Sequence, residues 1–536
     1  MNQHTAYRWA FFSTFAPLAV GAVSLAPFVR LLYPGDEIVS DPWRDYGALH
    51  LPLAEFAREE LFAGNMPLWN PYVGCGHPLH AAQQAGLCYP LSTPLIVALG
   101  ANRGLKVCLF AHLAICFAGT YLLARRLDIS AHAASYAALV VTWSGALMGH
   151  LAEGHVSMVL VASLVPWFFL ALCGFLARPG PMTALVLSVA GALCALAGHP
   201  QIVYYTLVGG GLCTAWSFWL GAAAREWRRV LGWGTCAGLI VVLLSAVQLL
   251  PTLELVRDGL AESGRGTARF GSTYALDGAD SARLLMPYLN GTPFAHVPQF
   301  DGSDHYHERV IYLGIAAPLL AVYGLSRAAT ATWQWGAAWG VLLALAVAFG
   351  ECTPAFAVLA KVLPGLSLFR CPGRVFCVAT LPAALLAGRG LDALARGERP
   401  AVGAGLLKVL SAGLCAANLV AYAALLYAPS VDWRQYAAYA RRSLLGDFSV
   451  WTVLAADVAA VFALAAAGRL RGWAVSLPLI VAAVFDLGYF NVGNFRTQPR
   501  EACDAARLPP ANAMARFVEA PNFAHLSYDA LRYSRW

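Results

Sequence analysis

Long apolar stretches alternate with short polar connections along most of this sequence. Runs of about 20 apolar residues span a bilayer as helices, whereas the strands of a membrane β-barrel are short and alternate apolar with polar residues. We therefore predict an all-α polytopic integral membrane protein, a helical bundle with about 13 transmembrane helices. Their predicted bounds are 9–32, 104–124, 132–149, 156–177, 182–197, 200–221, 230–254, 310–326, 333–349, 375–395, 403–427, 448–467 and 472–492.

The stretch from Tyr33 to Pro90 breaks this pattern. It is acidic, aromatic and rich in turn residues, and it holds seven carboxylates but only two arginines. Because the segments on either side are apolar, polar side chains concentrated here indicate chemistry or binding. We expect a structured first loop that the helical scaffold holds at the membrane surface.

Composition supports the membrane assignment and narrows the function. The chain of 536 residues is 59% hydrophobic and 12% charged, whereas soluble proteins carry about 25% charged residues. The net charge of +7 is explained by arginines in cytoplasmic loops rather than by nucleic-acid binding. The 13 cysteines follow no zinc or disulfide spacing, and Trp9 to Leu32 is too long for a cleaved signal and is expected to remain as an anchor.

Arginine placement predicts the orientation, because cytoplasmic loops carry an excess of basic residues. The arginine-bearing loops fall on one side if the N-terminus is inside. The long loops 33–90, 255–309, 350–373 and 428–447 then lie outside. We divide the chain into a transmembrane domain, 1–492, which includes loops 33–90 and 255–309, and a short external tail, 493–536.

Three carboxylates in the first loop are candidates for a general base: Asp41, Asp36 and Asp45. A carboxylate beside an apolar interface can remove a proton from a substrate. Asp41 precedes Pro42 and is also suited to capping a helix. Residues 47–63 have apolar side chains at helical spacing, which predicts an amphipathic helix that lies on the membrane interface or serves as an ordinary surface helix.

Arginines and aromatic residues near the predicted outer surface are candidates for donor binding. Arg370 and Arg374 flank a Cys-Pro-Gly turn, with Lys361 upstream, and arginine binds phosphate with two parallel hydrogen bonds. Interfacial arginines also reach lipid headgroups. Trp69, Asn70 and Tyr72 suit sugar faces and hydroxyls, although tryptophan is also typical of the aromatic belt of membrane proteins.

Further polar residues lie in or beside predicted external turns. His150, Glu153 and His155 share a short turn, and His199 precedes another span. Histidines in such turns either line a cavity or serve as hydrogen-bonded structural residues. The cluster Asp301, Asp304, His305, His307 and Glu308 contains ligand types for hard and borderline metals, but its spacing matches no known metal loop.

Two carboxylates fall inside predicted spans. Asp457 and Asp486 would be costly in a bilayer, and intramembrane carboxylates commonly serve transport or proton relay. They keep a transporter or lipid-carrier flippase as an alternative. That alternative predicts inverted repeats and broken helices in matching halves, and we find no internal repeat in the sequence.

The strings SDPWRDY and GNMPLWNPYVGCGHPLHAAQQAGLCYP, followed by GHPQ at 198–201, ERVIYLGI at 308–315 and LFRCPGRVF at 368–376, resemble the YfhO family of bacterial membrane proteins. That family is similar to the GT-C superfamily of multi-span glycosyltransferases. The resemblance implies a GT-C-like fold in the bacterial cytoplasmic membrane, a polyprenyl-phosphate-sugar donor and an essential acidic residue in the first external loop. Many members carry a soluble C-terminal domain, and we expect none in the tail 493–536 of this sequence.

We therefore expect an inverting glycosyltransferase that moves a sugar from a polyprenyl-phosphate donor to an extracytoplasmic acceptor of the cell envelope. Asp41 is the first choice for the base, with Asp36 and Asp45 in reserve, and Arg370 and Arg374 would neutralise the lipid phosphate. No cofactor is required by the sequence, a divalent metal stays an open alternative, and a non-catalytic scaffold protein is the other rival. The residues expected to line the substrate cavity are Trp69, Asn70, Tyr72, His77, Gln83, His155, His199, Glu308 and Tyr312.

Overall fold

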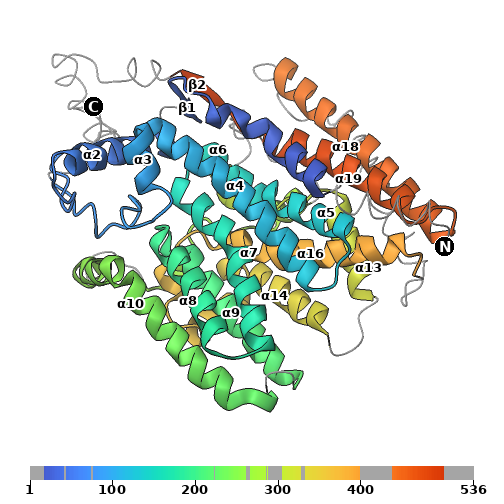
Figure 1. Cartoon of the computed structure of the whole chain (residues 1–536). Helices are drawn as coiled ribbons and strands as arrows, with labels where there is room; N and C mark the ends of the chain where they lie inside the picture. The colour runs from blue at the N-terminus through green and yellow to red at the C-terminus, as the bar shows by residue number, and fades with distance from the viewer. Residues whose placement is uncertain are drawn as a thin grey trace.

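The structure is a computed structural model that describes residues 17–40, 44–73, 76–221, 224–260, 266–284, 287, 305–326, 332–398 and 437–499. In these ranges the chain is almost entirely helical, with one two-stranded sheet (Figure 1). The predicted span 403–427, the candidate base Asp41 and the possible metal ligands Asp301 and Asp304 lie outside the described residues.

Five of the described helices are long and apolar enough to cross a membrane, which agrees with a multi-pass protein. Each coincides with a predicted span. An apolar run of this length forms a helix in a membrane because a helix pairs all of its own backbone N–H and C=O groups. They are α4 (Ala101–Arg126), α7 (Val156–Ala177), α10 (Trp227–Leu260), α16 (Phe376–Ala395) and α19 (Trp473–Phe490).

Other helices complete the bundle. They are α3 (Thr93–Leu99), α5 (Ala131–Thr142), α6 (Gly145–Glu153), α8 (Pro181–Leu196), α9 (Pro200–Trp219), α13 (Ala316–Ser326), α14 (Trp333–Ala348), α15 (Pro354–Val362) and α18 (Ala437–Ala466). In the connections lie α2 (Leu51–Phe62), α11 (Ala268–Gly271) and α12 (Tyr306–Arg309). Tight 3₁₀ turns are η1 (Ala26–Leu32), η3 (Ala224–Glu226), η4 (Ala279–Leu284), η5 (Gly350–Cys352), η6 (Leu366–Leu368), η7 (Pro372–Val375) and η8 (Val492–Asn494), and η2 (Tyr46–His50) is a short π-helix.

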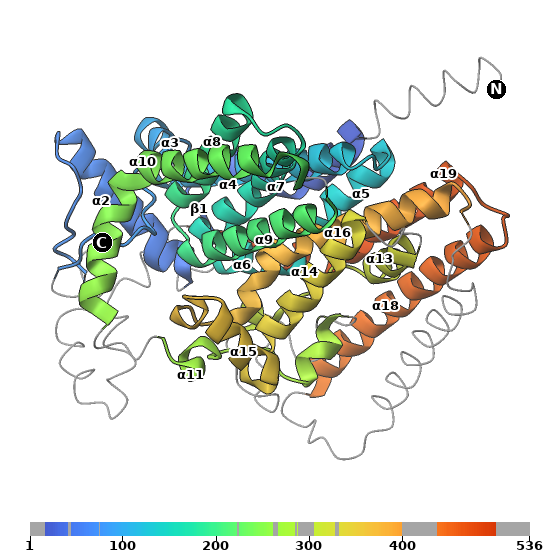
Figure 2. The same ribbon diagram turned by 90° about the horizontal axis from the view of Figure 1, so that it is seen from below.

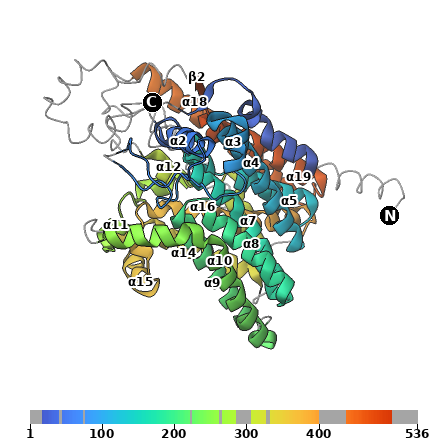
Figure 3. The same cartoon turned by 60° about the vertical axis from the view of Figure 1, so that its left-hand side comes forward.

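The core lies where α4, α5, α7 and α16 meet. Helix α4 packs on α5 and α7, and α16 packs on α5 and α13. At one edge, α18 and α19 lie side by side (Figures 1 and 2). At another edge α10 packs on α8, near α9 (Figure 3). Many apolar side chains of α10 are exposed, among them Leu239, Leu243 and Leu250, as expected for a helix that faces lipid.

Two sets of contacts anchor the start of the first loop. Strand β1 (Glu37–Val39) pairs antiparallel with β2 (Thr497–Pro499), which follows the last span. Lys106 of α4 is 1% exposed, and its ammonium donates to the backbone carbonyls of Gly35 at 2.8 Å and Glu37 at 3.0 Å. A buried ammonium is stable only with such partners, so these contacts fix the loop that leads to Asp45.

Helix α2 confirms a helix in the predicted region 47–63. Its apolar residues Leu53, Phe56 and Ala57 are buried and pack with Leu79 of the same loop. The apolar face therefore contacts protein, which favours a surface helix over one that lies in the bilayer interface.

The predicted span 132–149 is wrong, since the chain forms two helices that break at Trp143 and Ser144. The backbone groups exposed by the break find hydrogen-bond partners outside the two helices or in a capping side chain, as buried polar groups require. The Ser144 hydroxyl accepts from the Leu147 N–H at 3.3 Å, the Trp143 carbonyl accepts from the Asn491 amide at 2.7 Å, and the Gly145 N–H donates to the Tyr312 carbonyl at 2.8 Å.

The predicted span 310–326 is also too long, because its helix α13 begins only at Ala316. Gly314 has a φ of +85°, a conformation that favours glycine. The buried carboxylate of Asp486 accepts hydrogen bonds from the Tyr312 hydroxyl at 2.5 Å and from the Ile315 N–H at 2.7 Å. Asp486 thus caps a broken helix, which supplies a structural reason for this intramembrane carboxylate. The other one, Asp457, is exposed on α18.

Candidate functional site

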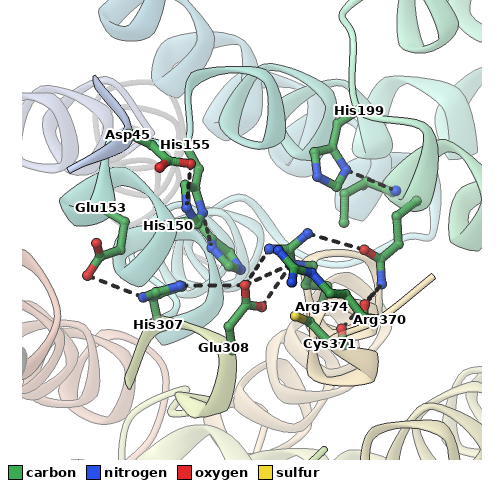
Figure 4. Close-up of polar contacts among 12 residues, drawn as sticks. Asp45, His150, Glu153, His155, His199, His307, Glu308, Arg370, Cys371 and Arg374 are labelled. Carbon is green, nitrogen blue, oxygen red and sulfur yellow. Dashed lines mark hydrogen bonds and ion pairs between the residues drawn. The ribbon is translucent and has the colours of Figure 1, made fainter. Parts of the chain in front are cut away.

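Five segments that are far apart in the sequence meet in one polar network (Figure 4). Each was predicted to be a connection on the same side of the membrane. The network contains Asp45 before η2, His150 and Glu153 on α6, His155 at the start of α7, Gln201 at the start of α9, His307 and Glu308 on α12, and Arg374 in η7.

An ion pair between Glu308 and Arg374 forms the centre of this network. The Arg374 Nε donates to both carboxylate oxygens of Glu308, at 3.0 and 2.8 Å, and an Nη also contacts this carboxylate. The Arg374 Nη1 donates to the Gln201 amide oxygen at 3.3 Å. The Glu308 side chain is 3% exposed and the Arg374 side chain 16%. Removing either partner would leave a buried charge without compensation.

The close approach behind this pair requires a glycine. A Cβ atom on Gly373 would lie 2.3 Å from the Glu308 carbonyl oxygen. The turn of LFRCPGRVF therefore needs its glycine so that η7 can pack on α12. This packing is what places the Arg374 guanidinium beside Glu308.

Histidines connect the ion pair to the first loop. The His155 Nε2 lies 3.2 Å from the Asp45 Oδ2, and the Nδ1 atoms of His155 and His150 are 2.9 Å apart. The His307 ring lies 4.9 Å from the His155 ring, centroid to centroid. The His307 Nε2 is 3.5 Å from Glu308, and its Nδ1 is 3.2 Å from Glu153, which also pairs with Arg44 of the first loop.

Burial and charge set the protonation states in the network. Burial opposes ionisation of Glu308, but the neighbouring Arg374 and hydrogen bonds from His307 and Arg374 hold the Glu308 pKa well below its usual range. Burial lowers the pKa of His150, His155 and His199, in spite of the carboxylates beside the first two. The Glu308–Arg374 pair is therefore ionised, and His150 and His155 are neutral, at neutral pH.

Arg370 differs from Arg374 because its side chain is exposed. Its carbonyl accepts from the Gln201 amide at 2.7 Å. The next residue, Cys371, has a φ of +57°, which is strained for a residue other than glycine. The Gln201 amide also donates to the Cys371 carbonyl at 3.2 Å, and the Cys371 N–H donates to the Thr273 carbonyl at 2.8 Å. These contacts hold a strained turn directly after Arg370.

Several predicted residues lie outside the network. Asp36 is exposed before β1, and Lys361 is exposed on α15. Trp69 and Tyr72 are exposed, while Asn70 pairs with His77 in an isolated bridge. Of the remaining candidates, Gln83 is buried with a φ of +58°, His199 accepts from the Ile202 N–H at 3.4 Å as a cap of α9, and Tyr312 bonds to Asp486.

Sequence reasoning assigned no role to Gln201, named Glu153 only as part of a short turn, and considered His307 only as a possible metal ligand. Gln201 was present in the string GHPQ, where its amide gave no sign that it would hold a turn near Arg374. A signal did exist for the other two, since each is a polar residue in a connection next to an apolar run. Among the described residues, no group of three histidine, cysteine, aspartate or glutamate side chains is arranged to hold a metal ion.

No protein-family model matches this chain, so the resemblance to the YfhO family stays a prediction. No curated protein matches it significantly. Its fold is similar to the crystal structure of ArnT from Cupriavidus metallidurans bound to undecaprenyl phosphate, with 13% identity, coverage of 99% of this chain and 85% of that chain, and a TM-score of 0.46. The apo structure of the same protein gives 15%, 95%, 82% and 0.45. Because both TM-scores lie below 0.5, a function has to be argued from this chain's own residues.

Proposed function

We propose that this protein is an inverting membrane glycosyltransferase that moves a sugar from a polyprenyl-phosphate donor to an acceptor outside the cytoplasmic membrane of a bacterium. One observation carries the proposal: a carboxylate of the first loop, Asp45, is joined through His155 and His307 to the Glu308–Arg374 pair. A candidate base is thereby connected to the turn that carries the exposed Arg370, the candidate cation. Glycosyl transfer from a lipid phosphate needs both.

In the proposed reaction, Asp45 takes the proton of the acceptor hydroxyl while the hydroxyl oxygen attacks the anomeric carbon. The bond between this carbon and the phosphate oxygen breaks, and its electron pair leaves with the polyprenyl phosphate. One displacement inverts the anomeric centre. Asp45 is half-exposed, with 45% of its side chain accessible, so an acceptor can reach it. Asp41, four residues earlier, and the exposed Asp36 stay the alternatives for the base.

The two arginines take different roles in this proposal. The Arg374 guanidinium is engaged by Glu308 and Gln201, so we assign it to positioning the turn. The exposed Arg370 is the better candidate to bind the lipid phosphate, because arginine binds phosphate oxygens in a fixed, bidentate geometry. The hydrogen bonds around Cys371 hold the strained backbone that presents Arg370, and strained residues are often found at functional sites.

The test uses the full chain in lipid nanodiscs. Binding of undecaprenyl phosphate is measured by native mass spectrometry, and transfer is measured as release of undecaprenyl phosphate from a panel of undecaprenyl-phosphate hexoses and pentoses in the presence of a cell-envelope fraction. Asp45→Asn should lower transfer by about 10²–10⁴-fold and leave binding intact. Arg370→Gln should weaken binding about tenfold or more, whereas Arg469→Gln, an exposed arginine in a connection on the predicted cytoplasmic side, should not. Unchanged transfer in Asp45→Asn, Asp41→Asn and Asp36→Asn would refute the carboxylate mechanism.

A further inference from the structure

His155 lies between two partners and uses both of its ring nitrogens. Its Nε2 faces the Asp45 carboxylate at 3.2 Å, and its Nδ1 faces the His150 Nδ1 at 2.9 Å. The side chain is 11% exposed. Neither nitrogen is therefore available to a substrate, so His155 can act on a reaction only through Asp45.

The two contacts select one tautomer. An ionised carboxylate only accepts hydrogen bonds, so the Nε2 atom of His155 must carry the proton. A neutral imidazole carries one proton, which leaves the Nδ1 atom of His155 as an acceptor and makes the Nδ1 atom of His150 the donor. His155 also stands at the N-cap position of α7, without a capping hydrogen bond from its side chain, and there the positive end of the helix dipole opposes a second proton on the ring.

Charged and titratable groups surround His150 and His155. They are Arg44, Asp45 and His50 from the first loop, Glu153 from α6, His199 at α9, His307 and Glu308 from α12, and Arg374 from η7. Glu153 pairs with Arg44 and His307, and Glu308 pairs with Arg374. These carboxylates have cationic or hydrogen-bond partners of their own. The tautomer of His155 is thus set by Asp45 on one side and His150 on the other.

We infer that His155 is a positioning residue for the transfer reaction: held in its Nε2–H tautomer by His150, it orients Asp45 and stabilises the ionised form of that carboxylate. This inference rests on the proposed function, since it takes Asp45 as the base. A hydrogen bond to the charged form of a carboxylate favours that form. The base consequently stays deprotonated at lower pH than it would without His155.

The first experiment compares the pH profile of kcat for release of undecaprenyl phosphate in nanodiscs. In His155→Phe, which removes the donor, kcat at pH 6.5 should fall about tenfold and the acidic limb should move up by about one pH unit. KM for the donor should stay within about twofold. His155→Gln places an amide N–H near the position of Nε2 and should restore most of the rate and the limb. His132→Gln, a histidine of α5 outside the network, is the matched control and should behave as wild type.

An acidic limb that stays at the wild-type pH in His155→Phe would overturn the inference, even if kcat fell. A second measurement does not depend on activity or on a folded variant. Nitrogen-15 NMR of histidine-labelled wild-type protein should show a proton on Nε2 of His155 and on Nδ1 of His150 at pH 7.5. The reverse tautomers, or a doubly protonated His155, would overturn the inference. A failure of the proposed function would give a different result. The Asp45→Asn variant would then transfer sugar at the normal rate, independently of the tautomers found for His155 and His150.

Discussion

Single residues decide whether this network can exist inside an apolar bundle. Residue types beside apolar runs were visible in the sequence, so Asp45, His155, Glu308 and Arg374 could be named as candidates. Their pairing could not, because it depends on a tertiary approach between distant segments. The sequence also suggested one role for both arginines. Whether an arginine pairs with a buried glutamate or faces outward depends on the packing around the turn at Gly373. This packing cannot be predicted from the local sequence pattern.

Glu308→Gln should destabilise the protein by about 3–5 kcal/mol, because the Arg374 charge would remain buried without its partner. The measurement is the unfolding free energy in detergent, from urea titration followed by tryptophan fluorescence. The control is Glu226→Gln, which removes the exposed i,i+3 pair between Glu226 and Arg229 and should cost at most about 1 kcal/mol. Equal effects of the two variants would contradict a buried, compensated pair.

Stability should fall as the pH is lowered from 7.5 to 5. Burial lowers the pKa of His150, His155 and His199 in the folded protein, so below about pH 6.5, the unfolded value, the unfolded chain binds protons that the folded chain does not. Each such histidine then removes up to about 1.4 kcal/mol per pH unit. Above pH 6.5 the term vanishes. Thermal midpoints at several pH values test the sign, and His199→Gln should flatten the slope.

Elements show where the periodic pattern succeeded and where it failed. The bounds of helices α4, α7, α16 and α19 were predicted to within a few residues, since an uninterrupted apolar run can cross a membrane in few conformations other than a helix. The breaks at Trp143 and at Gly314 were missed. Both lie in apolar sequence, and the groups that satisfy the exposed backbone, Asn491 and Asp486, come from the far end of the chain.

Helix α10 contains a second kind of break that the first loop repairs. Pro251 lies inside α10 and cannot donate to the carbonyl of Val247 four residues earlier. The His80 Nε2 lies 2.8 Å from this carbonyl oxygen, while the Gln248 amide donates to the His80 carbonyl at 2.7 Å. His80 thus supplies the hydrogen bond that proline removes, and it fixes the first loop to α10.

We expect His80→Phe to lower the unfolding free energy by about 1–3 kcal/mol, the cost of an unsatisfied buried carbonyl, and to speed amide exchange around Gln248. In a Pro251→Ala background the helix can make its own hydrogen bond, so His80→Phe should cost less there. A double-mutant cycle measures this difference. Additive effects of the two substitutions would show that His80 does not serve the proline break.

For the whole molecule, the contacts unite connections that arginine bias had placed on one side of the membrane. Which side faces outward stays a prediction. Single cysteines at Gly64, in the first loop, and at Arg225, between α9 and α10, are introduced into a parent in which four cysteines are replaced by serine. These are Cys236 and Cys352, which are exposed, and Cys75 and Cys503, which lie in segments predicted to be external. Gly64→Cys should react with an impermeant maleimide on intact cells, and Arg225→Cys only after permeabilisation. The opposite result would place the site in the cytoplasm and exclude an extracytoplasmic acceptor.

The pairing of β1 with β2 has a consequence for biosynthesis. Residues 37–39 leave the ribosome early, but their partner strand, 497–499, is made only after the last described span. The hydrogen bond that the Ser40 N–H donates to the Arg496 carbonyl, at 2.9 Å, also cannot form before Arg496 has been synthesised. During translation the segment that leads to Asp45 therefore stays without its final anchor until nearly all of the bundle has been inserted. A nascent chain of this protein would therefore have most of its spans inserted before the segment that leads to Asp45 gains its partner strand.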